Sequence, residues 1–191
     1  MTDIKTWADG EKITPAEMKK YVSDALRGFL EPPACRRTVA NQASEQKSAD
    51  TWHPVSFDKP GSGTGAGHSY DNTDGRMSDD PFKVRAPIAG LYEVSAGLVL
   101  RSASGSLTYA VASVNRNQSS GDAIGSTAFL RFGLGRATGV EKVGCGTATI
   151  TLNAGQWVSM AFKAESPVLV GSGAYAQFLS HLEIRWVGVK P

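Results

Sequence analysis

Apolar residues follow two different periods along the chain. In "ITPAEMKKYVSDALRGFLE" they recur three and four residues apart, which is typical of one face of a helix. From residue 34 onward apolar and polar residues alternate instead, as along strands that bury one face. The change falls at Pro32-Pro33, where proline prevents a helix from continuing. We therefore expect a helical segment over residues 1–33 and a β domain over residues 34–191.

Residues 14–17 carry the signals that begin a helix. Thr14 suits the N-cap, Pro15 suits the first helical position, and Glu17 completes a Thr-x-x-Glu capping box. The apolar stripe of this predicted helix consists of Met18, Val22, Ala25 and Phe29. So short a helix is not a stable coiled coil by itself, which leaves two interpretations open. The stripe packs on its own domain, or it is an anchoring stem that meets identical helices or another docking surface.

Nine segments of the remaining chain are predicted to be strands, separated by turns rich in Gly, Ser, Asn and Asp. They are residues 38–42, 52–57, 82–86, 91–101, 107–116, 128–134, 147–152, 156–164 and 174–187. Many short strands without a second helix are typical of an antiparallel sandwich of the jelly-roll or immunoglobulin type. Hydrophobic residues make up 41% and charged residues 20%, which indicates a globular domain rather than a disordered chain.

The stretch "FKVRAPIAGLYEVSAGLVLR" favours the jelly roll over the immunoglobulin type. It resembles the F-x-V-x-x-P-x-x-G-x-Y corner of the C1q/TNF-like jelly-roll family, which precedes a long central strand. The matching residues are Phe82, Val84, Pro87, Gly90 and Tyr92. A second stretch, "LNAGQWV", is similar to the family's L-x-x-G-D-x-V hairpin, with Gln156 in place of the usual Asp. The resemblance implies an all-β, C1q/TNF-like antiparallel jelly roll that assembles into homotrimers.

The N-terminal segment resembles the leader of bacteriophage virion proteins. In those proteins a W-x-D-G-x-x-(I/V)-T/S start precedes a short helix, a Leu-x-Pro-Pro linker and a C1q-like domain. The residues that carry the likeness are Trp7, Asp9, Gly10, Thr14, Leu30, Pro32 and Pro33. The family's usual Leu-Asn inside the helix is absent, and Met18-Lys19 occupy that region. The resemblance implies a trimeric structural protein on the virion surface. The lack of an export signal leads us to expect synthesis in the host cytoplasm, and the change of composition at Pro32-Pro33 leads us to expect that residues 1–33 join other virion proteins.

Within that class the tail tip or fibre and the decorated head are alternative positions. A free C1q-like module that binds glycans or proteins is the alternative from another class. We expect no enzyme, because G-x-S-x-G, HExxH and Walker patterns are absent from the sequence. A Cys145–His181 dyad is conceivable, but a histidine in a strand is usually structural. The net charge of +2 and the lack of a long apolar run lead us to expect no nucleic-acid partner and no membrane insertion. The stretch "GSGTGAGH" does not meet the G-x-G-x-x-G pattern, and we expect no cofactor.

The loop over residues 58–80 is the predicted place of ligand contact. Its carboxylates in "YDNTDGRMSDD" are of the kind that bind calcium, but the EF-hand spacing is not met and Asp-Gly is itself a turn signal. We therefore predict no metal. An aromatic ring can stack on a sugar while nearby carboxylates accept its hydroxyl hydrogens. The candidate glycan-contact residues are His68, Tyr70, Asp71 and Asp74. The alternative is that Tyr70 covers the edge of the core and the acids only turn the chain.

Several predicted strands carry large apolar residues on both faces. This pattern predicts that the sheet face that points away from the core is also covered. The predicted trimer interface comprises Phe129, Trp157, Tyr175 and Leu179, which alternate with residues assigned to the core. Cyclic symmetry would close such an interface between three copies. The alternative is that loops or the helix of the same chain cover this face.

Overall fold

The computed structural model describes residues 10–19, 30–38, 42–58, 69–103, 105–117, 128–138, 141–170 and 180–189. The chain divides into two compact units, Met1–Pro33 and Ala34–Pro191. Each unit is described separately below. Of the helical segments among these residues, none has the length and hydrophobicity that a bilayer crossing requires.

The first unit contains helix α1, Pro15–Met18, which begins as its sequence predicts. The backbone N–H of Glu17 donates to Thr14 Oγ1 at 3.2 Å, and the backbone N–H of Thr14 donates to Glu17 Oε2 at 3.0 Å. This reciprocal pair is the predicted capping box, and it satisfies two backbone donors at the helix start. The side chain of Met18 is 47% exposed. Val22, Ala25 and Phe29, the other members of the predicted stripe, lie outside the described residues.

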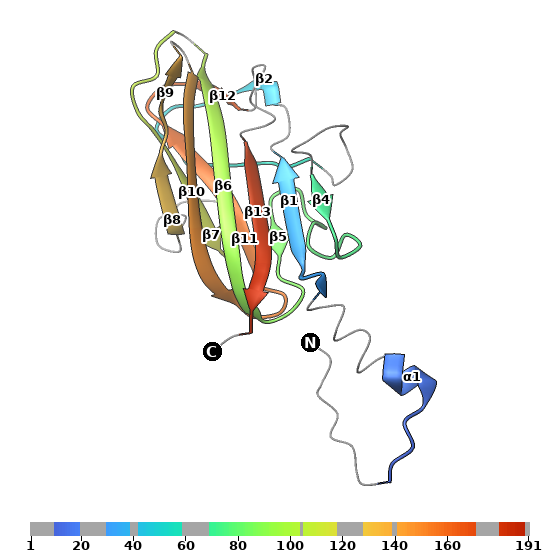
Figure 1. The fold of residues 1–191 in the computed structure, drawn as a ribbon. Helices are drawn as coiled ribbons and strands as arrows, with labels where there is room; N and C mark the ends of the chain where they lie inside the picture. Colours follow the sequence, from blue (N-terminus) through green and yellow to red (C-terminus); the bar gives the residue numbers. More distant parts are fainter. Residues whose placement is uncertain are drawn as a thin grey trace. The chain divides into compact units, whose positions relative to one another are not determined.

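The second unit is a sandwich of two antiparallel sheets, which confirms the predicted all-β jelly-roll class (Figure 1). The eight-stranded sheet contains β1 (Ala34–Thr38), β2 (Gln42–Lys47), β4 (Tyr70–Asp71), β6 (Gly90–Ser102), β9 (Gly135–Thr138), β10 (Glu141–Leu152), β12 (Val168–Val170) and β13 (His181–Gly188). The five-stranded sheet contains β3 (His53–Pro54), β5 (Val84–Arg85), β7 (Ala110–Arg116), β8 (Ala128–Gly133) and β11 (Trp157–Ala164).

The long strand β6 organises the eight-stranded sheet. Strand β10 pairs with it along one edge, while β13 and β12 share its other edge. Strand β13 in turn pairs with β1, so the C-terminal strand lies between β6 and the first strand of the domain. Strand β1 also pairs with β4, the short strand at the margin of this sheet.

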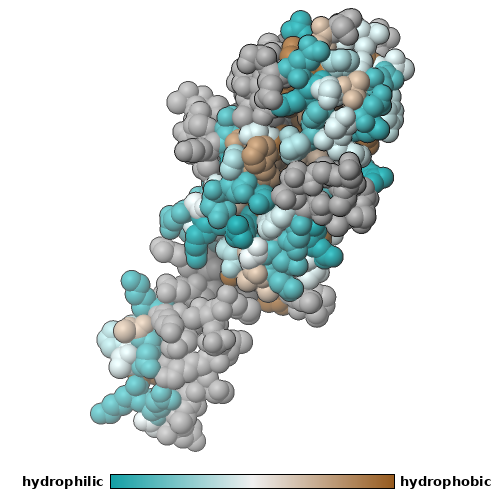
Figure 2. Space-filling model, turned by 180° about the vertical axis from the view of Figure 1, so that it is seen from behind, coloured by the Kyte–Doolittle hydropathy of each residue, from teal (hydrophilic) through white to brown (hydrophobic). Residues whose placement is uncertain are grey.

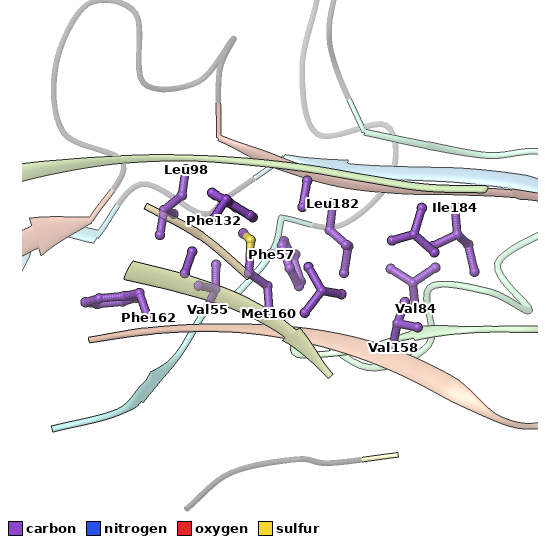
Figure 3. Close-up of a cluster of buried hydrophobic side chains, with 14 of the residues drawn as sticks. Val55, Phe57, Val84, Leu98, Phe132, Val158, Met160, Phe162, Leu182 and Ile184 are labelled. Carbon is purple, nitrogen blue, oxygen red and sulfur yellow. The ribbon is translucent and has the colours of Figure 1, made fainter. Parts of the chain in front are cut away.

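The hydrophobic core lies between the two sheets (Figure 3). Leu98, Leu182 and Ile184 point inward from the eight-stranded sheet, and Val158, Met160 and Phe162 meet them from β11. Each of these strands alternates between core-facing and outward-facing residues, as the period of two in the sequence predicts.

The Pro-x-x-Gly corner before β6 has a specific packing requirement. The Tyr92 hydroxyl donates to the carbonyl oxygen of Ile88 at 2.9 Å and so closes the corner over the preceding turn. A Cβ atom at Gly90 would lie 2.1 Å from Trp186 Nε1 and 2.6 Å from the carbonyl oxygen of Gly188. Only glycine therefore allows the end of β13 to lie this close to the start of β6.

Several strand boundaries differ from the sequence prediction. Strand β1 occupies Ala34–Thr38, earlier than the predicted segment 38–42, and strands β2, β4, β9 and β12 were not predicted. Strand β10 begins at Glu141 rather than at residue 147. The sequence did not predict its first half, because that half contains Gly144 and Gly146 and lacks an alternation of apolar and polar residues. A Cβ atom at either glycine would lie 3.1 Å from the Phe132 ring, so these glycines make room for β8.

Candidate functional site

The predicted ligand loop is held at the margin of the eight-stranded sheet. Tyr70 and Asp71 form β4, in which Tyr70 is 41% exposed and Asp71 is half-buried. Asp74 is exposed in a turn, with a positive φ of 57° that is followed by 82° at Gly75. His68 lies outside the described residues. The structure thus places Tyr70 in a strand and Asp74 in an exposed turn four residues later.

The carboxylate of Asp71 is used inside its own loop. It accepts hydrogen bonds from the backbone N–H of Thr73 at 2.8 Å and of Met77 at 3.0 Å, and from the hydroxyls of Thr73 and Ser78 at 2.5 and 2.8 Å. These four bonds occupy the acceptor sites that a calcium ion or a sugar would need. They favour the interpretation in which the acids turn the chain. Among the described residues no group of three or more His, Cys, Asp or Glu side chains is placed to hold a metal ion.

Arg37 fixes the same loop from the inner side of β1. Its side chain is 1% exposed, and its guanidinium donates to the backbone carbonyl oxygens of Phe57, Asp58, Ser78 and Asp80 at 2.7 to 3.2 Å. Burial lowers the pKa of Arg37 because it disfavours the cation. The guanidinium thereby joins residues 57–58 and residues 78–80 to β1.

On the outer side of the sheet, Tyr70 takes part in a network that was not predicted. Its hydroxyl donates to Glu183 Oε1 at 3.1 Å, and Arg36 Nη1 donates to Glu183 Oε2 at 3.1 Å. Burial raises the pKa of Tyr70 to about 12, and the charge of Glu183 and its hydrogen bond add to this shift. Glu183 therefore joins an aromatic side chain and a guanidinium from two other strands.

Strand register extends this network into a line of polar side chains across the sheet. Five outward-pointing residues lie opposite one another on five adjacent strands. In order across the sheet they are Thr147 on β10, Ser95 on β6, Glu183 on β13, Arg36 on β1 and Tyr70 on β4. We call this line the Tyr70 row. Thr147 and Tyr70 at its ends are exposed, and the three residues between them are half-buried. The row is the candidate contact site of this sheet face.

Two of the four residues predicted to form a trimer interface, Phe129 and Trp157, lie among the residues that the structure describes. Phe129 on β8 is half-buried and packs against the core. Trp157 on β11 is half-buried, and the ammonium of Lys83 lies 4.7 Å from the centre of its ring. Tyr175 and Leu179 lie outside the described residues. On the face in Figure 2, hydrophilic residues predominate among the coloured atoms and hydrophobic ones form small separate areas. The interface assignment stays a prediction.

The two cysteines occupy different environments. Cys35 is fully buried on β1, and burial raises the pKa of its thiol to about 12. Cys145 is exposed on β10. Cys145 and His181 both pair with Gly97, from opposite sides, so they lie two strands apart, or about 10 Å between Cα atoms. His181 Nε2 lies 3.4 Å from Ser95 Oγ. The structure therefore does not place the thiol and the imidazole on adjacent strands.

The sandwich, its strand order and its closed corner define a TNF-like jelly roll. Murine APRIL, in a crystal structure at pH 5.0, is similar with a TM-score of 0.51 and 11% sequence identity, covering 81% of this chain and 98% of that chain. Eiger TNF from S. frugiperda is similar with a TM-score of 0.51 and 13% identity, covering 83% of this chain and 94% of that chain. Identities this low support the fold alone. No family model matches the sequence, and no curated protein is significantly similar to it.

Proposed function

We propose that the protein is a homotrimeric, non-enzymatic structural component of a bacteriophage virion, exposed on the tail as a minor tail, tip or fibre protein. The observation that carries this proposal is the division of the chain at Pro33. A small unit with a capped helix start precedes a TNF-like jelly roll. This order of parts is the one that the N-terminal resemblance to phage virion proteins implies. Decoration of the head is the alternative position.

The two units are proposed to have different roles. The N-terminal unit anchors the protein to other virion proteins, because a short amphipathic helix is stable only when its apolar stripe packs against another protein surface. The jelly roll faces outward and presents its sheets to the surroundings. Threefold assembly is supported by the TNF-like fold and by the tendency of homo-oligomers to adopt closed cyclic symmetry.

Labelled electron microscopy of purified particles tests the proposal. Antibody label at the tail of each particle is the expected result, whereas label over the head would select the decoration role. Sedimentation of the isolated protein should give the mass of a trimer. A monomer at all concentrations, together with absence from particles, would instead favour a free binding module.

A further inference from the structure

We propose that the outward face of the five-stranded sheet binds a neutral polysaccharide chain beside the C-terminal end of β11. The inference rests on the proposed function and deepens it, because it names the ligand that an outward-facing jelly roll would meet on a host surface. A homotrimer of the TNF-like fold covers the outward face of the eight-stranded sheet, so the Tyr70 row would lie between subunits. Ligand contact therefore belongs to the opposite sheet.

Two aromatic side chains flank the proposed site. Trp52 directly precedes β3, where His53 packs its ring on Phe162 of the core, at 5.5 Å between ring centres. Trp52 itself is half-buried and is not one of the described hydrophobic side chains that pack on the core, so the alternation along the chain directs it outward. Tyr109 directly precedes the buried Ala110 of β7 and is 55% exposed on the outward side.

The strand pairings place three more side chains between these rings. Continuing the pairing of β3 with β11 by one residue puts Trp52 opposite Lys163, which pairs with the half-buried Val111 on its other side. The backbone N–H of Glu165 donates to the carbonyl oxygen of Tyr109 at 3.2 Å, so these two residues form the next row. We call the five residues the Trp52 platform: Trp52, Tyr109, Val111, Lys163 and Glu165.

The separation of the two rings indicates a chain of sugars as the ligand. Trp52 and Tyr109 lie two strands apart, at about 4.8 Å per strand, and two residues apart along the strands, at about 3.4 Å per residue, which gives about 12 Å between their Cα atoms. One pyranose does not reach both rings, so each ring would stack on a different sugar of the same chain.

The polar groups between the rings match the hydroxyl edges of sugars. Lys163 Nζ lies 3.9 Å from Asp50 Oδ1, beyond hydrogen-bond distance, so its N–H donors remain available to a ligand. Glu165 Oε1 accepts hydrogen bonds from the backbone N–H groups of Thr108 and Tyr109. Within the described part of the domain both of these bonds go to Oε1, which leaves Oε2 as an acceptor for hydroxyl hydrogens.

The character of this face favours a neutral sugar chain over a protein or a polyanion. Figure 2 shows the side of the molecule that lies behind β6 in Figure 1, where the five-stranded sheet is, and its hydrophobic areas are small and separate. A stable protein partner needs a larger continuous contact with an apolar centre. Lys163 stands against two carboxylates, those of Asp50 and Glu165, so acidic sugars would meet an excess of negative charge.

The Trp52 platform lies at the end of the domain away from residue 34, where the chain enters it. The start of β1 lies opposite the end of β13, which pairs with the start of β6. The start of β6 also pairs with the end of β10, from which a short hairpin leads to the start of β11. The platform is at the other end of β11, so attachment through residues 1–33 would leave this end of the domain free for contact.

Two matched pairs of variants test the platform in the full-length protein. The probes are immobilised neutral oligosaccharides built from glucose, galactose or N-acetylglucosamine, beside sialylated and uronic-acid oligosaccharides. We expect the unmodified protein to bind at least one neutral probe. Tyr109→Ala should weaken that binding about tenfold, because one of the two stacking surfaces is lost. Its control is Phe82→Ala, which removes an aromatic side chain that is 37% exposed shortly before β5, at the other end of the same sheet.

The second pair tests the ammonium of the platform. Lys163→Met keeps most of the side-chain length and should weaken binding several-fold, whereas Lys83→Met should leave it unchanged, because Lys83 lies over Trp157 at the start of β11. Circular dichroism and sedimentation establish that each variant keeps its fold and oligomeric state.

Four results would each overturn the inference: unchanged binding by Tyr109→Ala, equal effects of the two lysine changes, recognition of acidic probes alone, or failure to bind any probe at millimolar concentration. Normal incorporation of a non-binding protein into particles would leave the proposed virion role intact, so the two failures are distinguishable.

Discussion

Replacing Arg37 by Met should destabilise the jelly roll far more than the same change at its neighbour Arg36. Methionine keeps most of the side-chain length but offers no donor. The change removes the guanidinium N–H groups that donate hydrogen bonds to the carbonyl oxygens of Phe57, Asp58, Ser78 and Asp80. Arg36 is the matched control because it has the same chemistry one residue earlier on β1, yet it points outward into an ion pair with Glu183.

The magnitude follows from burial. Hydrogen bonds to a charged donor contribute about 1.5–3 kcal/mol each, but removing a buried cation also removes its desolvation cost. Each buried carbonyl oxygen left without a donor costs about 1–3 kcal/mol, and four of them are left here. Because the desolvation cost of the cation is relieved at the same time, we expect Arg37→Met to cost about 3–5 kcal/mol in total. The Arg36–Glu183 ion pair is partly buried, with side chains 21% and 28% exposed, so we expect Arg36→Met to cost about 1–2 kcal/mol, between the values for exposed and for buried pairs.

Urea unfolding at fixed protein concentration measures both changes, with sedimentation to confirm that the oligomeric state is unchanged. The free energies of unfolding of the two variants should differ by about 1–4 kcal/mol, which is the difference between the two expected losses. A difference below about 0.5 kcal/mol, within the usual spread of surface substitutions, would refute the reasoning. It would mean that the carbonyl contacts of Arg37 do not hold the loop to β1.

Three further predictions concern the corner, the cysteines and the N-terminal unit. Gly90→Ala should lower the free energy of unfolding by about 1–3 kcal/mol, because the added Cβ would overlap Trp186 and the Gly188 carbonyl. The control is Ala89→Gly, at an exposed position in the same turn, and equal melting temperatures of the two variants would contradict the prediction. In the folded protein at pH 8, a thiol reagent should modify Cys145 and spare Cys35, because burial shields the Cys35 thiol and its raised pKa keeps it protonated. Rapid modification of both thiols before unfolding would argue against this packing. Deletion of residues 1–31 should leave a folded β protein, by circular dichroism, that no longer joins particles, and normal incorporation would reject the anchoring role.

Local signals in the sequence predicted local structure well. The Thr14–Glu17 capping box is made by residues three apart, so the sequence alone contains both partners. The long strands β6 and β11 follow from alternation, because each buries one face on the core. Strand β4 could not be predicted in this way. It has two residues and exists because β1 lies beside it.

The candidate site was predictable only in part, for the same reason. Tyr70 stands out as an aromatic residue in a polar loop, but Arg36 and Glu183 are separated by 147 positions and meet only through the register of β1 and β13. Asp71 has the residue type of a ligand, and the structure shows that its loop consumes the carboxylate. Residue type therefore indicated the region, and strand pairing decided which side chains share a surface.

The place of β13 between β1 and β6 has a consequence for the order of folding during synthesis. Strands β1 and β6 leave the ribosome long before residues 181–188, yet each needs β13 as its hydrogen-bonding neighbour. Until β13 arrives, both present unpaired strand edges, which are templates for pairing with other chains. The sheet can close only after nearly the whole domain has been translated. A ribosome that stalls within the last strands should therefore release an aggregation-prone chain rather than a partly folded domain.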